Sequence, residues 1–94
     1  MFVGVLQVDL HLDKARTLKE KRQVIRSILD RVRAGFNISA AEVESLDLQQ
    51  RAGLAFAAVS NDADYVRGQL QTLLRSLQQH PAALRVILAG QQTD

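Results

Sequence analysis

Asp9 and His11 come closest to an acid–base pair in this sequence. They lie two positions apart in a segment with alternating apolar residues, so a strand would project both side chains to one side. A carboxylate beside an imidazole can relay a proton, but a histidine at a strand end is more often an ordinary surface residue. Ser60 stands before Asn61 and Asp62, where helix capping alone accounts for the motif. We therefore predict that the protein is not an enzyme.

Metal and cofactor sites have equally little support. His11 and His80 show no metal-ligand spacing with the carboxylates, the chain has no cysteine, and its five glycines form no phosphate-binding loop. We expect no metal and no cofactor.

The strongest signal is a run of positive charge between residues 14 and 33. Eight Lys or Arg residues accompany two acids there, which gives this segment +6, whereas the rest of the chain carries −4. Such segregation favours a polyanionic partner, because each neutralised phosphate releases a counterion. The alternative is a solvated helix flank whose charges pair locally. The candidate nucleic-acid-binding residues are Lys14, Arg16, Lys19, Lys21, Arg22, Arg26 and Arg33.

Lys21 differs from the other cations of this run. On a helical wheel it lies near the centre of the apolar side, at the first turn. Its ammonium group must reach solvent along the core edge or meet a carboxylate such as Asp9 or Glu42. A structural role is favoured for this residue.

Two helices and four strands are expected to position these residues. Thr17 and Glu20 have the spacing of a capping box, so a helix of about sixteen residues should start at Leu18 and stop at Ala34 and a left-handed Gly35. Asn61 is the expected cap of a second helix that ends near His80. Apolar patterning predicts strands over residues 4–12, 36–43, 54–59 and 83–89, with a polar tail over residues 91–94.

The order of these elements is βαββαβ. Right-handed crossovers would then place the first and third strands in the middle of a four-stranded antiparallel sheet with both helices on one face. We predict an α+β, ferredoxin-like fold in which residues 1–94 form one domain, and this fold says little about function because it hosts many activities.

The sheet face away from the helices is expected to be small and apolar at its centre. By parity it shows Gln7, Asp9 and His11 toward one end and an apolar centre of Val3, Val5, Ala55, Ala57 and Val59, without the RNP1 pattern of an RNA-recognition sheet. A flat patch of this kind is best covered by another protein surface. These five apolar residues are therefore the candidate oligomer interface, and we expect a homodimer.

Composition limits the location of the protein. The apolar opening segment has no basic flank and meets Gln7 and Asp9 too early for a signal peptide or a membrane helix. We expect a cytoplasmic protein without membrane contact.

Several short motifs, in order, resemble the YlxP-like family of small bacterial proteins of unknown function. They include the Leu-Lys-Glu-Lys-Arg run at residues 18–22, Phe-Asn-Ile-Ser at 36–39, Gln-Arg-Ala at 50–52 and Val-Ser-Asn-Asp at 59–62. The resemblance covers almost the whole chain and implies a ferredoxin-like fold in the bacterial cytoplasm. It also implies, by the association of such genes with those for translation initiation and ribosome maturation, a role around ribosomal RNA.

Two functions rank ahead of a third, an enzyme or small-anion binder that would use Asp9, His11 and the turn at Ser60. The first is an accessory protein that binds structured RNA or a ribosomal particle through the basic helix. The alternative is a homo-oligomeric protein-interaction module that does not bind nucleic acid.

Overall fold

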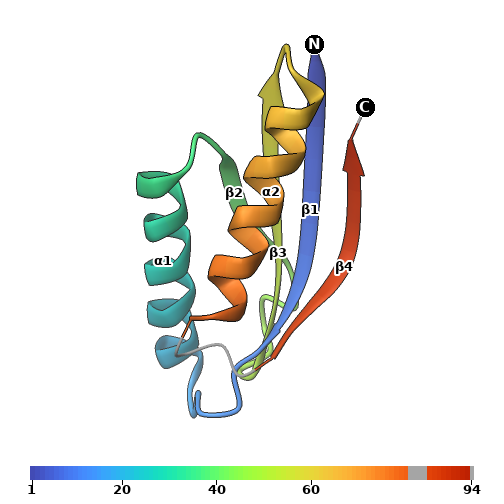
Figure 1. Cartoon of the computed structure of the whole chain (residues 1–94). Helices are drawn as coiled ribbons and strands as arrows, with labels where there is room; N and C mark the ends of the chain where they lie inside the picture. Colours follow the sequence, from blue (N-terminus) through green and yellow to red (C-terminus); the bar gives the residue numbers. More distant parts are fainter. Residues whose placement is uncertain (81–84, 94) are drawn as a thin grey trace.

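A computed structural model describes residues 1–80 and the backbone of residues 85–93. Its elements alternate as the periodicity predicts, and the α+β class with two helices and an antiparallel sheet is confirmed (Figure 1). They are β1 (Phe2–His11), α1 (Leu18–Gly35), β2 (Ser39–Glu44), β3 (Arg51–Ser60), α2 (Ala63–Gln78) and β4 (Arg85–Thr93).

The strands follow the order β2-β3-β1-β4, and each neighbouring pair is antiparallel. The register of β1 and β3 runs from Phe2 opposite Ser60 to His11 opposite Arg51. Alternate residues of β1, from Leu6 to Leu10, are buried beneath the helices, whereas the residues between them face the open side. Both helices lie over the same face of the sheet (Figure 1).

The helix starts show which capping predictions were right. Thr17 caps α1 as predicted, since its Oγ1 accepts a hydrogen bond from the backbone N–H of Glu20 at 3.1 Å. Asp62, and not Asn61, caps α2, because the Asp62 carboxylate accepts from the N–H groups of Asp64 and Tyr65. The cap prediction at Asn61 was thus wrong by one position.

The end of α1 also differs from the prediction. The helix includes Gly35 and stops at Phe36, which has an extended backbone with φ −136°. No glycine of the described part of the chain has a positive φ, so the predicted left-handed stop is wrong. The chain leaves the helix by an extended residue instead.

Boundaries differ from the periodicity in every strand. β1 begins two residues before the predicted residue 4 and ends at His11, one residue before the predicted residue 12. β2 begins at Ser39, because residues 36–38 connect it to α1, and β3 starts three residues before Leu54. β4 continues to Thr93, so residues 91–93 belong to the strand and are not a free polar tail. The predicted start of this strand, at residues 83–84, lies outside the described residues. Backbone pairing with β1 extends β4 through a polar sequence that has no apolar alternation.

No helix in the described part of the chain is long and apolar enough to cross a membrane.

Candidate nucleic-acid interface

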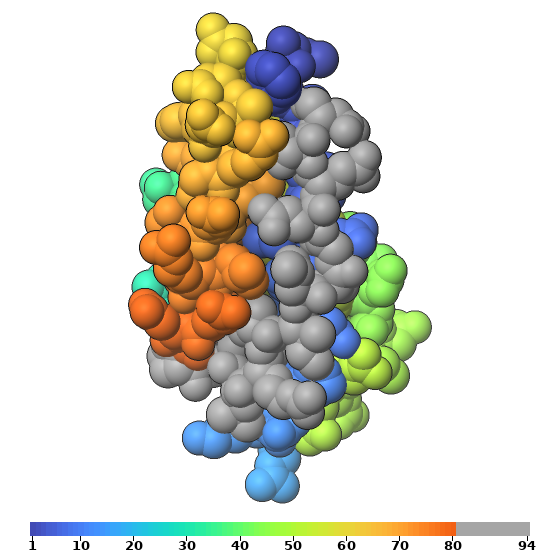
Figure 2. All heavy atoms as spheres, turned by 45° about the vertical axis from the view of Figure 1, so that its right-hand side comes forward, coloured from blue at the N-terminus to red at the C-terminus, as the bar shows by residue number. Residues whose placement is uncertain are grey.

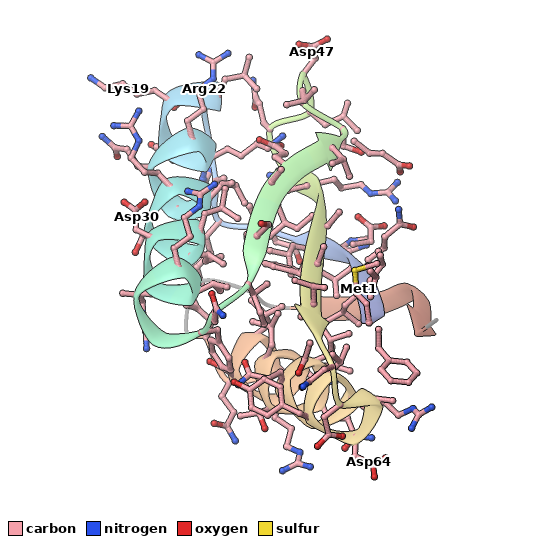
Figure 3. All side chains as sticks on the ribbon, turned by 90° about the horizontal axis from the view of Figure 1, so that it is seen from above. Met1, Lys19, Arg22, Asp30, Asp47 and Asp64 are labelled. Atoms are coloured by element: carbon pink, nitrogen blue, oxygen red, sulfur yellow. The ribbon has the colours of Figure 1, made fainter. Side chains whose placement is uncertain are left out.

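Three cations from the first half of α1 form an unpaired basic strip. Lys19, Arg22 and Arg26 are exposed, and no acid of residues 1–80 lies within ion-pair distance of them. Their spacing of three and four residues aligns them on one flank of the helix. Lys19 and Arg22 point outward at the end of α1 where the loop with Asp47 also lies (Figure 3). We call Lys19, Arg22 and Arg26 the basic strip.

Arg33 continues the strip in sequence but makes contacts of its own. Its Nη2 donates a hydrogen bond of 2.6 Å to the backbone oxygen of Ala40, and its Nη1 lies 3.7 Å from the Asp30 carboxylate. The guanidinium is thereby held against β2, so Arg33 is less available than the strip to an external ligand.

Lys14 and Arg16 lie in the turn before α1, and both side chains are exposed. The turn is fixed by Gln50, whose Nε2 donates to the backbone oxygens of Asp13 at 3.1 Å and Ala15 at 3.3 Å. The turn and the β2–β3 loop consequently meet at one end of the molecule, shown in light blue and green in Figures 1 and 2. The two turn cations extend the basic surface beyond the first turn of α1.

Lys21 is the one candidate that the structure removes from the interface. Its side chain is 1% exposed, and its Nζ lies 2.9 Å from Oε2 of Glu42 on β2. The same ammonium donates to the backbone oxygens of Ser45 at 2.5 Å and Leu46 at 3.3 Å. Of the two carboxylates suggested by the sequence, Glu42 is right and Asp9 is wrong, because Asp9 points to the opposite face of the sheet. Lys21 is therefore a structural cation.

The β2–β3 loop is built around this buried ammonium. Ser45 adopts φ 61°, a left-handed conformation that turns its carbonyl and that of Leu46 toward Lys21. The pairing register shifts between Glu42 and Glu44, and a Cβ on Gly53 would lie 2.7 Å from Cβ of Glu44. Only glycine fits opposite this bulge. The loop is a fixed neighbour of the basic strip.

A second polar cluster lies at the same end, on the open sheet face. His11 Nε2 and Asp9 Oδ2 are 3.6 Å apart, and Arg51 Nη2 lies 2.5 Å from the same carboxylate oxygen. A hollow of about 120 Å³ borders Asp9 and Arg51. The sequence brings Asp9 and His11 together correctly, but it misses Arg51, which is positioned by the register that sets it opposite His11. The Asp9 carboxylate therefore lies between His11 and Arg51 and is shared by the two side chains.

The proposed interface residues occupy the open face as parity predicts. Val3 pairs with Val59, Val5 with Ala57 and Gln7 with Ala55 across β1 and β3. Val3 and Val59 are 38% and 58% exposed, which is high for valine in a central strand. Their part in an oligomer stays a prediction.

These observations define a small α+β domain with one basic helix flank and one open, apolar sheet face. A family described as "Protein of unknown function (DUF503)" matches residues 3–89. The uncharacterized protein YlxP of Bacillus subtilis (strain 168) is 34% identical over 85 residues, which cover 90% of this chain and 92% of that protein. The chain belongs to this YlxP-like family, as its motifs indicated. Neither description names an activity.

Proposed function

We propose that this protein is a cytoplasmic accessory factor of ferredoxin-like fold that binds structured RNA, for example on a ribosomal particle, and has no enzymatic activity. Contact is made by the basic strip, Lys19, Arg22 and Arg26, with Lys14 and Arg16 from the preceding turn. Arg33 plays a lesser part, and Lys21 supports the surface from inside.

The observation that carries this proposal is the absence of acidic partners around the strip in residues 1–80. Other exposed arginines of the two helices lie beside acids, Arg67 at 3.1 Å from Asp64 and Arg33 at 3.7 Å from Asp30. Lys19, Arg22 and Arg26 instead keep their charge available, and arginine can donate two hydrogen bonds to one phosphate. Such a flank suits the regularly spaced phosphates of an RNA helix.

We favour structured RNA over single strands because aromatic side chains are scarce on the open sheet face. Binding of single strands depends on bases stacked on aromatic side chains, and among the open-face residues of β1 and β3 the one ring is His11, at the end of β1, beside Val, Ala and other polar side chains. A backbone-directed, shape-dependent contact needs no such platform.

A fluorescence anisotropy titration tests the proposal. The probe is a labelled ribosomal RNA fragment with a helical stem, measured at several salt concentrations between 50 and 200 mM, which are chosen to expose counterion release. We expect affinity to fall steeply with salt. The double variant Arg22→Glu/Arg26→Glu should lower affinity at least tenfold and flatten the salt slope by one to two units, since about 0.7 to 0.9 unit is lost per phosphate contact.

A matched control separates local contact from net charge. Arg67→Glu/Arg75→Glu on α2 changes the formal charge equally, and both arginines are exposed, but they lie outside the strip. Affinity should change less than threefold in this control. Equal losses in the two double variants, or no binding by the native protein at 50 mM salt, would contradict the proposal and leave the alternative of a protein-interaction module without RNA.

A further inference from the structure

The open face of the sheet combines a ridge with a hollow. Val3 and Val59 face each other across β1 and β3 and are the most exposed apolar pair of this face. Next to them lies a shallow apolar hollow of about 240 Å³, lined by Val5, Ser39, Ala41, Ala55 and Ala57 among others. Small side chains on three neighbouring strands leave this space. The hollow has room for a valine side chain from outside.

The ridge, Val3 and Val59, lies next to the hollow along β1 and β3. Two copies related by a two-fold axis could therefore each place a ridge in the hollow of the other. Ala57 lies two residues before Val59 on β3 and pairs with Val5 on β1, so it stands between the two features. A two-fold axis through the position of Ala57 would seat Val59 of each copy in the hollow of the other. This is the reciprocal geometry that an isologous contact requires.

The distribution of charge favours this face over the α1 flank as the contact between two copies. The ridge and the hollow contain no charged side chain, and the ionic residues further along are mutually neutralised, as Arg51 and Asp9 are. The basic strip lies on α1, on the other side of the sheet. Two copies that met through their α1 flanks would bring like charges together, whereas contact through the open face keeps them apart.

The edge of β2 is not free to extend the sheet in a second copy. The guanidinium of Arg33 donates to the backbone oxygen of Ala40, near the start of a short strand that is already bulged near Glu44. Blocked and bulged edges prevent strand addition. Face-to-face packing of two sheets does not need this edge.

We infer that two copies of this chain form a symmetric dimer through the open sheet face, with Val59 of each copy packed into the hollow beside Ala57 of the other. The dimer presents its two basic strips outward, so a large RNA can contact both. The dimer itself does not depend on the proposed RNA binding.

Sedimentation velocity on the full chain tests the oligomeric state. We expect a dimer at micromolar concentration. Ala57→Arg, which places a charge at the axis, should weaken association at least a hundredfold, whereas Ala34→Arg on the exposed surface of α1 should leave it unchanged. A monomeric native protein at 100 µM, or a dimer that survives Ala57→Arg, would overturn the inference.

Cysteine cross-linking gives a second test of the dimer, in which the contact between the two copies is kept intact. The sequence has no cysteine, so a single Ala57→Cys substitution reports on its own environment. Mild oxidation should convert the Ala57→Cys variant largely into a disulfide-linked dimer. The Gly68→Cys variant, changed on the exposed side of α2, should run as a monomer in denaturing, non-reducing electrophoresis. Equal linking of both variants would contradict an axis near Ala57. Arg22→Glu/Arg26→Glu should still dimerise, so failure of RNA binding and failure of dimerisation are distinguishable.

Discussion

The two helices cover the same face of the sheet but use their charges differently. α2 buries four aliphatic residues, Val66, Leu70, Leu73 and Leu77. α1 buries three aliphatic residues and gives the fourth internal position to Lys21. On their surfaces each helix holds one ion pair, Arg67 with Asp64 on α2 and Arg33 with Asp30 on α1. Among the described residues, α2 leaves the single exposed cation Arg75 without an acid, whereas the first half of α1 leaves three, Lys19, Arg22 and Arg26.

α2 thus covers the core, whereas α1 also anchors the β2–β3 loop and carries the basic strip. The buried ammonium of Lys21 ties α1 to Glu42 and to the β2–β3 loop, and the exposed cations beside it form the basic strip. Neighbouring residues such as Lys21 and Arg22 therefore have opposite roles, because one helical step of about 100° moves a side chain from the core to the flank. Variants of the two helices measure how far this contrast extends.

The largest effect is expected at Lys21. Lys21→Met should lower the free energy of unfolding by about 3 kcal/mol, because Glu42 and two loop carbonyls lose a buried cation. Lys19→Met, two residues away and exposed, should change the free energy of unfolding by less than about 0.5 kcal/mol. Urea denaturation gives both values. The double variant Lys21→Met/Glu42→Leu should recover much of the loss, and a double variant no better than the single one would show that the carbonyl contacts dominate.

The two helix caps should contribute more equally. Thr17→Ala removes the acceptor of the Glu20 N–H at 3.1 Å, and Asp62→Ala removes the acceptor of the Asp64 N–H at 3.0 Å. We expect each to destabilise the protein by about 1 kcal/mol. Only the loss at Asp62 should shrink with added salt, since its carboxylate also interacts with the helix dipole. Thermal melts at low and high salt make this comparison, and equal salt responses would argue against the dipole contribution.

Gly68 offers a small gain that is specific to α2. It lies inside the helix, is exposed, and a Cβ there would meet nothing within 4 Å. Gly68→Ala should stabilise the protein by roughly 0.5 to 1 kcal/mol, because alanine restricts the unfolded chain more than glycine does. A loss of stability in chemical denaturation would mean that the open surface of α2 is covered in solution.

The smallest effect concerns His80, where the end of α2 approaches α1. Burial, and then the charge of Arg31, hold the pKa of His80 below its ordinary value of 6.5. As the pH falls through 6.5, the unfolded chain binds a proton that the folded protein resists, so stability decreases toward lower pH. His80→Gln should flatten this part of the stability profile between pH 7.5 and pH 5.5. An unchanged profile would assign the acid sensitivity to carboxylates.

Local sequence patterns predicted the helices and strands, and they also predicted which side chains share a face. The Thr17 and Glu20 spacing identified the start of α1, and alternation in β1 identified which side chains share the open face. The same patterns misplaced the cap of α2 by one residue and missed the length of β4, because neighbouring Asn and Asp are equally suited to capping and because backbone pairing can extend a polar strand.

The candidate site was predicted less completely than the fold. Helical phase brought Lys19, Arg22 and Arg26 together without tertiary information, since a helix fixes neighbours three and four residues apart. The contacts of Arg33 with β2 and of Arg51 with Asp9 join segments far apart in the chain. No local spacing could rank these cations by availability.

The amino-acid sequence alone determined the periodicities, the excess of positive charge over residues 14–33 and the apolar character of one sheet face, because these depend on residues a few positions apart. Only the tertiary structure decided that Lys21 meets Glu42, that Ser45 and Leu46 turn their carbonyls toward it, and that Val59 stands beside a hollow. The physical reason is that strand register and helix packing choose which distant groups meet, and burial then decides whether a charge holds the fold together or remains available to a partner.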